Sequence, residues 1–385
     1  MRTTISVILG SLLLFFLGCA AGGGDVSTDV GEGKLTVRDD KGFEREIKPE
    51  ELEFRTAQQF LASGNYQEAI SHLNTAVGIN PRYLKAWSEL GRVQSKLKNY
   101  EAGIQAYQQA LEIEPENDAV IASVAYNYLQ IEDLEKSGDY YRMMIAKDSL
   151  SYDGNVHLGF IYQKLEEVDN AIRHYELALM SNPSDAMSMG SLANLYGKKG
   201  DEKKKAEYLT KAVEAAPDNY RFKTQLGSLY LKQKEYEKAI PLFEDLVENF
   251  PDMAAYHQNL GFALSQTGRK SEAAAELEKA IELKGDDPLI FAILSQIYNE
   301  LGQTGKAIET SRAGLNLGKG QGAFLHYQWG VALSKQKLFD EAILEFEKVI
   351  SYRDPVWTEP ARKQIDRQEK LKKREELIKE KEKWE

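Results

Sequence analysis

Along residues 84–117, apolar and small residues recur every three or four positions, in two sets that are separated by a polar turn. The first set includes Leu90 and Val93, and the second includes Tyr107. This spacing places the side chains of each set on one face of an α-helix. Pro115 follows the second set, at a position where proline ends a helix. The stretch therefore predicts two antiparallel helices of about twelve residues each.

The pattern returns with a period of 34 residues, which is the distance from Pro217 to Pro251. Three residue types keep this period or a multiple of it, which indicates an array of repeats, each of them one pair of helices. These residues are Pro81, Pro115, Pro183, Pro217, Pro251, Gly91, Gly159, Gly227, Gly261, Ala76, Ala110, Ala178, Ala212 and Ala280. The repeats run over residues 50–83, 84–117, 118–151, 152–185, 186–219, 220–253, 254–287, 288–322 and 323–356.

The repeat closely resembles the tetratricopeptide repeat (TPR) family, which is marked by Trp, Leu-Gly, Tyr, Ala and Pro at fixed positions. The resemblance covers about four-fifths of the chain. It implies an all-α fold, a right-handed superhelical solenoid of about nine helix-turn-helix repeats over residues 50–356. A charged C-terminal capping or extension helix is expected over residues 357–385. In the second repeat the family positions are held by Trp87, Leu90, Gly91, Tyr107, Ala110 and Pro115.

The N-terminus reads as a targeting signal. Residues 5–17 are apolar, too few to span a bilayer but suited to a signal peptide. Cys19 is the one cysteine of the chain and follows Gly18 at the end of this run. That arrangement resembles the lipobox of bacterial lipoproteins, which implies a signal peptide over residues 1–18 and lipid attachment at Cys19. The alternative is an ordinary signal peptide cut near Ala20 or Ala21, with the cysteine incidental.

Residues 19–49 are expected to be a lipid anchor and a flexible linker, since they are rich in Gly, Asp and Lys. A short extended piece around residues 35–37 is left open. Because Ala20 rather than Asp follows Cys19, the resemblance implies a bacterial envelope protein, lipid-anchored in the outer membrane and facing the periplasm.

The composition argues against several classes of partner and site. With 49 Lys and Arg against 60 Asp and Glu, the formal net charge of −11 argues against a nucleic-acid partner. A single cysteine excludes an internal disulfide and a cysteine-based zinc cluster. The five histidines have no spacing typical of a metal-binding helix, so we expect neither a metal nor a cofactor. His257 and His326 occupy equivalent positions in two repeats and are interpreted as packing residues.

In this family, stacked helix pairs form a concave groove that is lined mainly by the first helix of each repeat. The resemblance implies that a protein or peptide partner binds there, as a helix or an extended segment. The aromatic residues are the preferred contacts, because aromatic side chains supply much of the energy at interfaces. Carried over from the family register, the groove residues are Phe54, Arg92, Tyr126, Phe160, Asn194, Phe262 and Tyr327.

The C-terminal segment, residues 357–385, mixes ten Lys and Arg with eight Asp and Glu. We expect its first turns to cap the last repeat and the remainder to be a solvated helix. A short coiled coil or a docking helix is the alternative.

The preferred hypothesis is therefore a non-enzymatic envelope lipoprotein that uses the groove as a protein-interaction scaffold or adaptor for complex assembly. The alternative is a periplasmic enzyme or glycan-binding accessory associated with the cell wall, with its site in the groove. Self-association is a third hypothesis.

Overall fold

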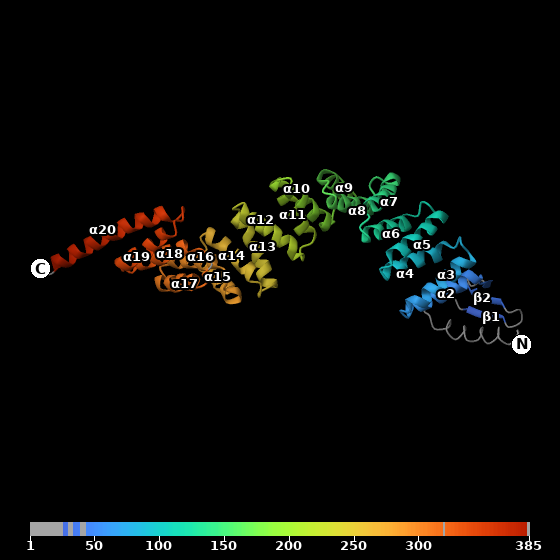
Figure 1. Ribbon diagram of the computed structural model, residues 1–385, viewed down its shortest axis with the longest axis horizontal. Helices are drawn as coiled ribbons and strands as arrows, with labels where there is room; N and C mark the ends of the chain where they lie inside the picture. Colours follow the sequence, from blue (N-terminus) through green and yellow to red (C-terminus); the bar gives the residue numbers. More distant parts are fainter. Residues whose placement is uncertain (1–25, 30–33, 39–43, 319, 383–385) are drawn as a thin grey trace. The chain divides into compact units, whose positions relative to one another are not determined.

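The computed structural model of the protein describes residues 26–29, 34–38, 44–318 and 320–382 (Figure 1). The predicted signal peptide and the lipid attachment at Cys19 lie outside these residues. Within them, nineteen α-helices and three β-strands occur. The chain forms two compact units, with the boundary between Ser188 and Met189, and each unit is described by itself.

Eighteen of the helices alternate as the first and second members of nine pairs, one pair in each predicted repeat, which confirms the all-α repeat fold. The first helices are α2 (Pro49–Ala62), α4 (Leu84–Lys96), α6 (Asp118–Gln130), α8 (Tyr152–Lys164), α10 (Ala186–Lys198), α12 (Tyr220–Lys232), α14 (Ala254–Gln266), α16 (Pro288–Glu300) and α18 (Gly322–Lys335). The second helices are α3 (Tyr66–Ile79), α5 (Tyr100–Ile113), α7 (Leu134–Lys147), α9 (Val168–Ser181), α11 (Glu202–Ala215), α13 (Tyr236–Asn249), α15 (Lys270–Lys284), α17 (Thr304–Asn316) and α19 (Phe339–Ser351).

A three-stranded antiparallel sheet lies within residues 19–49, the segment expected to be a linker. The short extended piece considered from the sequence at residues 35–37 falls inside the middle strand. Strands of three to five residues are too short for a clear alternation of apolar and polar positions, so the pattern did not predict them. The strands, in sheet order, are β1 (Val26–Asp29), β2 (Lys34–Arg38) and β3 (Glu44–Glu46).

Within a pair, the periodic glycine lets a large side chain of the second helix pack directly on the backbone of the first. A Cβ at Gly91 would lie 2.7 Å from Cδ1 of Tyr107, and one at Gly227 would lie 2.9 Å from Cε2 of Phe243. Phe243 is fully buried. The alanines of the period pack equally closely, because each of the following is 0% exposed: Ala76, Ala110, Ala178, Ala212 and Ala280.

Neighbouring pairs are joined by tyrosine hydroxyls of the first helices. The Tyr298 hydroxyl donates a hydrogen bond to the carboxylate of Glu278, a residue of the preceding second helix. Gln108 Nε2 donates to the Tyr128 hydroxyl at 3.3 Å, and the same spacing of twenty residues separates both pairs. The rings of Tyr128 and Tyr298 are buried, so these tyrosines both fill the space between repeats and satisfy a polar group there.

Helix α20 (Thr358–Glu382) caps the last repeat. Ala361 and Gln368 are fully buried on it, and Gln368 Oε1 accepts a hydrogen bond from Ser334 Oγ of α18 at 2.7 Å. In the view of Figure 1 its last turns project past α19. The capping role expected of this segment is thereby confirmed for its first turns.

Candidate functional site

The seven residues predicted to face the groove all lie on first helices, one residue to a helix. Four of them belong to the first unit and three to the second. They are Phe54 in α2, Arg92 in α4, Tyr126 in α6, Phe160 in α8, Asn194 in α10, Phe262 in α14 and Tyr327 in α18.

In the first unit, Arg92, Tyr126 and Phe160 form what we call the exposed row. They stand 34 residues apart, at the same position of three successive first helices, and all three are exposed. The exposed fraction is 47% for Tyr126 and 36% for Phe160. Their chain neighbours Ala125 and Ile161 are buried, so each aromatic ring projects from a helix that is anchored in the core. Exposed aromatic side chains on packed helices are suited to bind a partner, because burying them on association is favourable.

Charged groups form part of the exposed row. Arg92 donates two hydrogen bonds to the carboxylate of Glu89 on its own helix, from Nε at 2.9 Å and from Nη2 at 2.5 Å. The hydrogen bond with Glu89 raises the pKa of Arg92, and the desolvation that opposes it is smaller. Lys164 Nζ lies 5.5 Å from the centre of the Phe160 ring. The exposed row thus combines apolar faces with a fixed ion pair and a lysine whose ammonium sits over an aromatic ring.

The remaining aromatic residues of the prediction already pack inside the protein. Phe54 meets Tyr83 edge-on at 5.5 Å between ring centres, and Phe262 meets Tyr236 edge-on at 5.9 Å. Tyr327 lies 5.0 Å from the ring of Trp357. All three predicted residues are half-buried, whereas Asn194 is exposed. Their contact with a partner stays a prediction.

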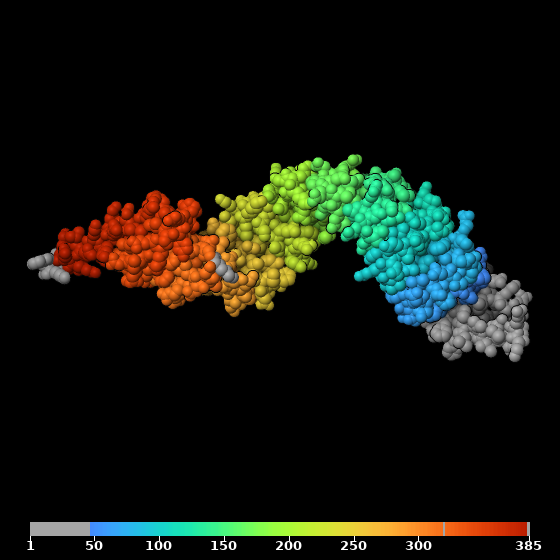
Figure 2. Space-filling view, in the orientation of Figure 1, coloured from blue at the N-terminus to red at the C-terminus, as the bar shows by residue number. Residues whose placement is uncertain are grey.

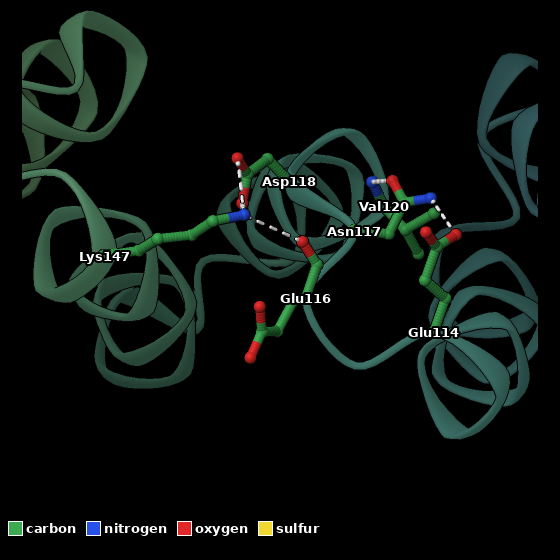
Figure 3. A network of polar contacts seen from close by, with 6 residues as sticks. All are labelled: Glu114, Glu116, Asn117, Asp118, Val120 and Lys147. Carbon is green, nitrogen blue, oxygen red and sulfur yellow. Dashed lines mark hydrogen bonds and ion pairs between the residues drawn. The ribbon is translucent and has the colours of Figure 1, made fainter.

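A polar network fixes the turn that precedes α6, the helix that carries Tyr126 (Figure 3). Lys147 Nζ, at the end of α7, donates to the carbonyl oxygen of Glu116 at 3.2 Å and to Asp118 Oδ1 at 3.1 Å. Asn117 caps α6, since its Oδ1 accepts a hydrogen bond from the backbone N–H of Val120 at 3.2 Å. The start of α6 is thereby bonded to the end of α7.

Four of the histidines take part in polar pairs that the hydrophobic periodicity did not reveal. In each pair a residue of the first helix meets a residue nineteen positions later in the second helix. A search of the sequence for polar residues that recur at this spacing could have found the pairs. His257 and His326 are among them, which confirms their interpretation as packing residues. The pairs are Glu53 with His72 at 2.6 Å, Asn155 with His174 at 2.9 Å, His257 with Glu276 at 2.6 Å and His326 with Glu345 at 2.6 Å.

The pKa values of Glu345 and His157 are shifted from their ordinary values. Burial raises the pKa of Glu345, but hydrogen bonds from His326 and Lys348 outweigh it and hold the pKa below its usual value. Burial lowers the pKa of His157, whose ring stacks on Tyr141 at 4.5 Å between ring centres. Glu345 is buried and His157 is half-buried, and neither belongs to the exposed row.

Among the side chains of residues 47–318 and 320–382, no group of three or more His, Cys, Asp or Glu is arranged to hold a metal ion. None of the described helices combines the length and the apolar character that crossing a membrane requires.

Curated relatives match part of this chain. Protein bimA of Emericella nidulans is 27% identical over 27% of this chain and 13% of its own length. The BBSome complex member BBS4 homolog of Drosophila melanogaster is 26% identical over 39% of this chain and 32% of its own length. The chain thus spans less than a third of either relative. Among solved structures, YrrB, described as a TPR protein with an unusual peptide-binding site, is 19% identical, with a TM-score of 0.43 over 51% of this chain and 97% of its own. That likeness is too low to bear on what this chain binds.

Family models agree with the helix pairs described above. One model, described as tetratricopeptide repeat, matches residues 60–125, 206–258 and 231–297. A second model with the same description matches residues 152–185 and 188–219. Together these matches cover more than half of the 385 residues. The chain therefore belongs to the tetratricopeptide repeat family, whose repeats are scaffolds for protein–protein interaction.

Proposed function

We propose that this protein is a non-enzymatic lipoprotein of the bacterial envelope that recruits a protein or peptide partner through the first helices of its repeats. The observation that carries the binding part is the exposure of Tyr126 and Phe160 at one register position of two successive first helices. It would act as a scaffold or adaptor in complex assembly. The name of the BBSome complex member BBS4 homolog, a relative that works within a complex, is consistent with such a role.

The partner segment would lie across α6 and α8 and cover both rings. Burying an aromatic side chain fully is worth about 1.5–3 kcal/mol, and part of each ring is already buried, so we expect roughly 1–2 kcal/mol from each ring. Lys164, beside Phe160, would donate a hydrogen bond to a carboxylate of the partner. An apolar segment with an acidic residue next to it fits these contacts.

The envelope location rests on the N-terminal sequence. Lipid on Cys19 would hold the protein at the outer membrane, facing the periplasm, with residues 20–48 between the lipid and the first helix pair. Metabolic labelling with a fatty acid in a bacterial host tests this. Label and membrane fractionation should both be lost in Cys19→Ala, and retention of both in that variant would contradict the anchor.

Affinity capture with the full chain tests the binding site. Tyr126→Ala with Phe160→Ala should weaken capture of the partner by roughly tenfold or more, which corresponds to at least 1.4 kcal/mol. The matched control is Met143→Ala with Met180→Ala, which removes two exposed apolar side chains from second helices of the same unit. We expect this control to change binding by less than about twofold. Capture that is unaffected by the first pair of substitutions would show that the exposed row is not the site.

A further inference from the structure

The capping helix α20 has two different sides. The side that packs on the last repeat carries charges that are already paired. Lys372 Nζ lies 2.5 Å from Asp340 Oδ1, and Glu375 Oε1 lies 3.3 Å from Lys337 Nζ. These ion pairs and the buried Gln368 fix which side of α20 is turned away from the repeats.

The side turned away carries four cations, Lys363, Arg367, Lys370 and Arg374, which we call the basic stripe. They follow one another at steps of four, three and four residues, so they lie along one face of the helix. All four are exposed, and with Asp366 and Leu371 they line an open hollow of about 470 Å³. Within the described part of the chain, none of the four forms an ion pair or a hydrogen bond. Figure 2 shows α20 at the red end of the chain, open to solvent on the side in view.

We propose that the basic stripe binds an acidic α-helix of a partner protein. Steps of three and four residues are those along which one helix meets another, so carboxylates with the same steps on a partner helix would face the four cations in turn. Leu377 and Ile378 continue the face by one step and are 59% and 45% exposed, which gives the same partner helix an apolar contact at the end of the stripe. The chain as a whole carries −11, so the four cations of the stripe gather positive charge on an otherwise acidic protein.

The α20 helix of a second copy does not fit the stripe. Two copies of α20 paired along this face would bring cations opposite cations in either direction, and like charges in contact repel. An anionic membrane fits less well than a helix. A flat surface would also meet Asp366 at the border of the stripe, and α20 has no wide apolar face to enter the lipid. A helix touches only a narrow strip, and the cations occupy such a strip.

The test uses the full chain and a fluorescein-labelled, alanine-based helical peptide with glutamates at steps of three and four along one face, with binding followed by fluorescence anisotropy. A control peptide has the same composition, with its glutamates spread around the helix. Arg367→Glu with Lys370→Glu should weaken binding by roughly tenfold or more. The matched control, Lys373→Glu with Lys379→Glu, makes the same change in net charge on α20 outside the stripe, and we expect less than about a twofold effect. A peptide with lysines in place of the glutamates should bind the Arg367→Glu, Lys370→Glu variant better than the original chain.

Three results would overturn the proposal. The two double variants could lose affinity equally, the two acidic peptides could bind equally, or the chain could bind phosphatidylglycerol vesicles but not the peptide. Because the basic stripe and the exposed row lie in different units, loss of peptide binding at α20 is distinguishable from loss of partner capture through Tyr126 and Phe160.

Discussion

Replacing Gly227 with alanine tests the packing rule that builds each repeat. A Cβ at this position would lie 2.9 Å from both Cε2 and Cζ of Phe243, whereas carbon atoms in ordinary contact are about 3.5–4.0 Å apart. The ring must therefore move by more than about half an ångström, and overpacking of this kind costs about 1–3 kcal/mol. Alanine recovers about 1 kcal/mol through its higher helix propensity. We expect Gly227→Ala to lower the local free energy of unfolding by up to about 2 kcal/mol.

The size of the steric effect follows from a double-mutant cycle. Phe243→Ala removes the ring and should by itself cost about 3–5 kcal/mol. In that background the new Cβ at position 227 meets no ring, so Gly227→Ala should stabilise by about 1 kcal/mol. Helix propensity contributes equally to both arms of the cycle and cancels. The coupling energy should therefore equal the overpacking cost, about 1–3 kcal/mol.

Hydrogen exchange over α12 and α13 is the appropriate assay, because repeat arrays open locally rather than as one unit. Gly305→Ala in α17 is the matched control, since a Cβ there would have no atom within 4 Å. It should be neutral, or stabilise by up to about 1 kcal/mol. A coupling energy below about 0.5 kcal/mol between positions 227 and 243 would refute the packing rule.

Further predictions concern the turn before α6 and the titrating groups. Lys147→Met removes the bonds to Glu116 and Asp118. Because these groups are exposed, the substitution should lower the free energy of unfolding by less than about 1 kcal/mol. Hydrogen exchange should become faster mainly in residues 114–118. Glu345 has a lowered pKa, so its stabilisation is complete above the unfolded pKa and is lost as the pH falls through the folded pKa. Acid unfolding followed by tryptophan fluorescence should show a shallower pH dependence in Glu345→Gln. Burial lowers the pKa of His157, so α8 should lose stability as the pH falls below the ordinary value of 6.5. This loss should be measurable as faster hydrogen exchange in α8, and it should be smaller in His157→Phe.

The start of each helix pair could be predicted to within one residue because one pattern recurs nine times. A single window leaves the ends of a helix uncertain, but a shared period fixes them together. The repeat predicted to begin at residue 118 has α6 beginning at Asp118, and the repeat predicted at 220 has α12 beginning at Tyr220. The same period predicted the buried alanines, since a position that tolerates only a small side chain in one repeat does so in the others.

The exposure of the candidate binding residues could not be predicted in the same way. Tyr126 and Phe262 occupy one register position, yet Tyr126 is exposed while Phe262 is half-buried against Tyr236. The preceding second helix carries a tyrosine at the equivalent position in both repeats, Tyr100 and Tyr236, so residue type at these positions does not predict which ring is covered. The polar pairs nineteen and twenty residues apart, such as Glu278 with Tyr298, likewise join two helices and escape a search of single faces.

The polar network of Figure 3 also has a consequence for binding. Lys147 joins the end of α7 to the start of α6, and α8 follows α7 after a short turn. Lys147 therefore fixes the start of α6, which carries Tyr126, against the end of α7, the helix that leads directly into α8 and Phe160. A partner that covers both rings gains affinity when their separation is fixed beforehand, because less freedom is lost on binding. Lys147→Met should thus weaken partner capture modestly without removing any contact with the partner, and a faster dissociation with an unchanged association rate is the form that this loss should take.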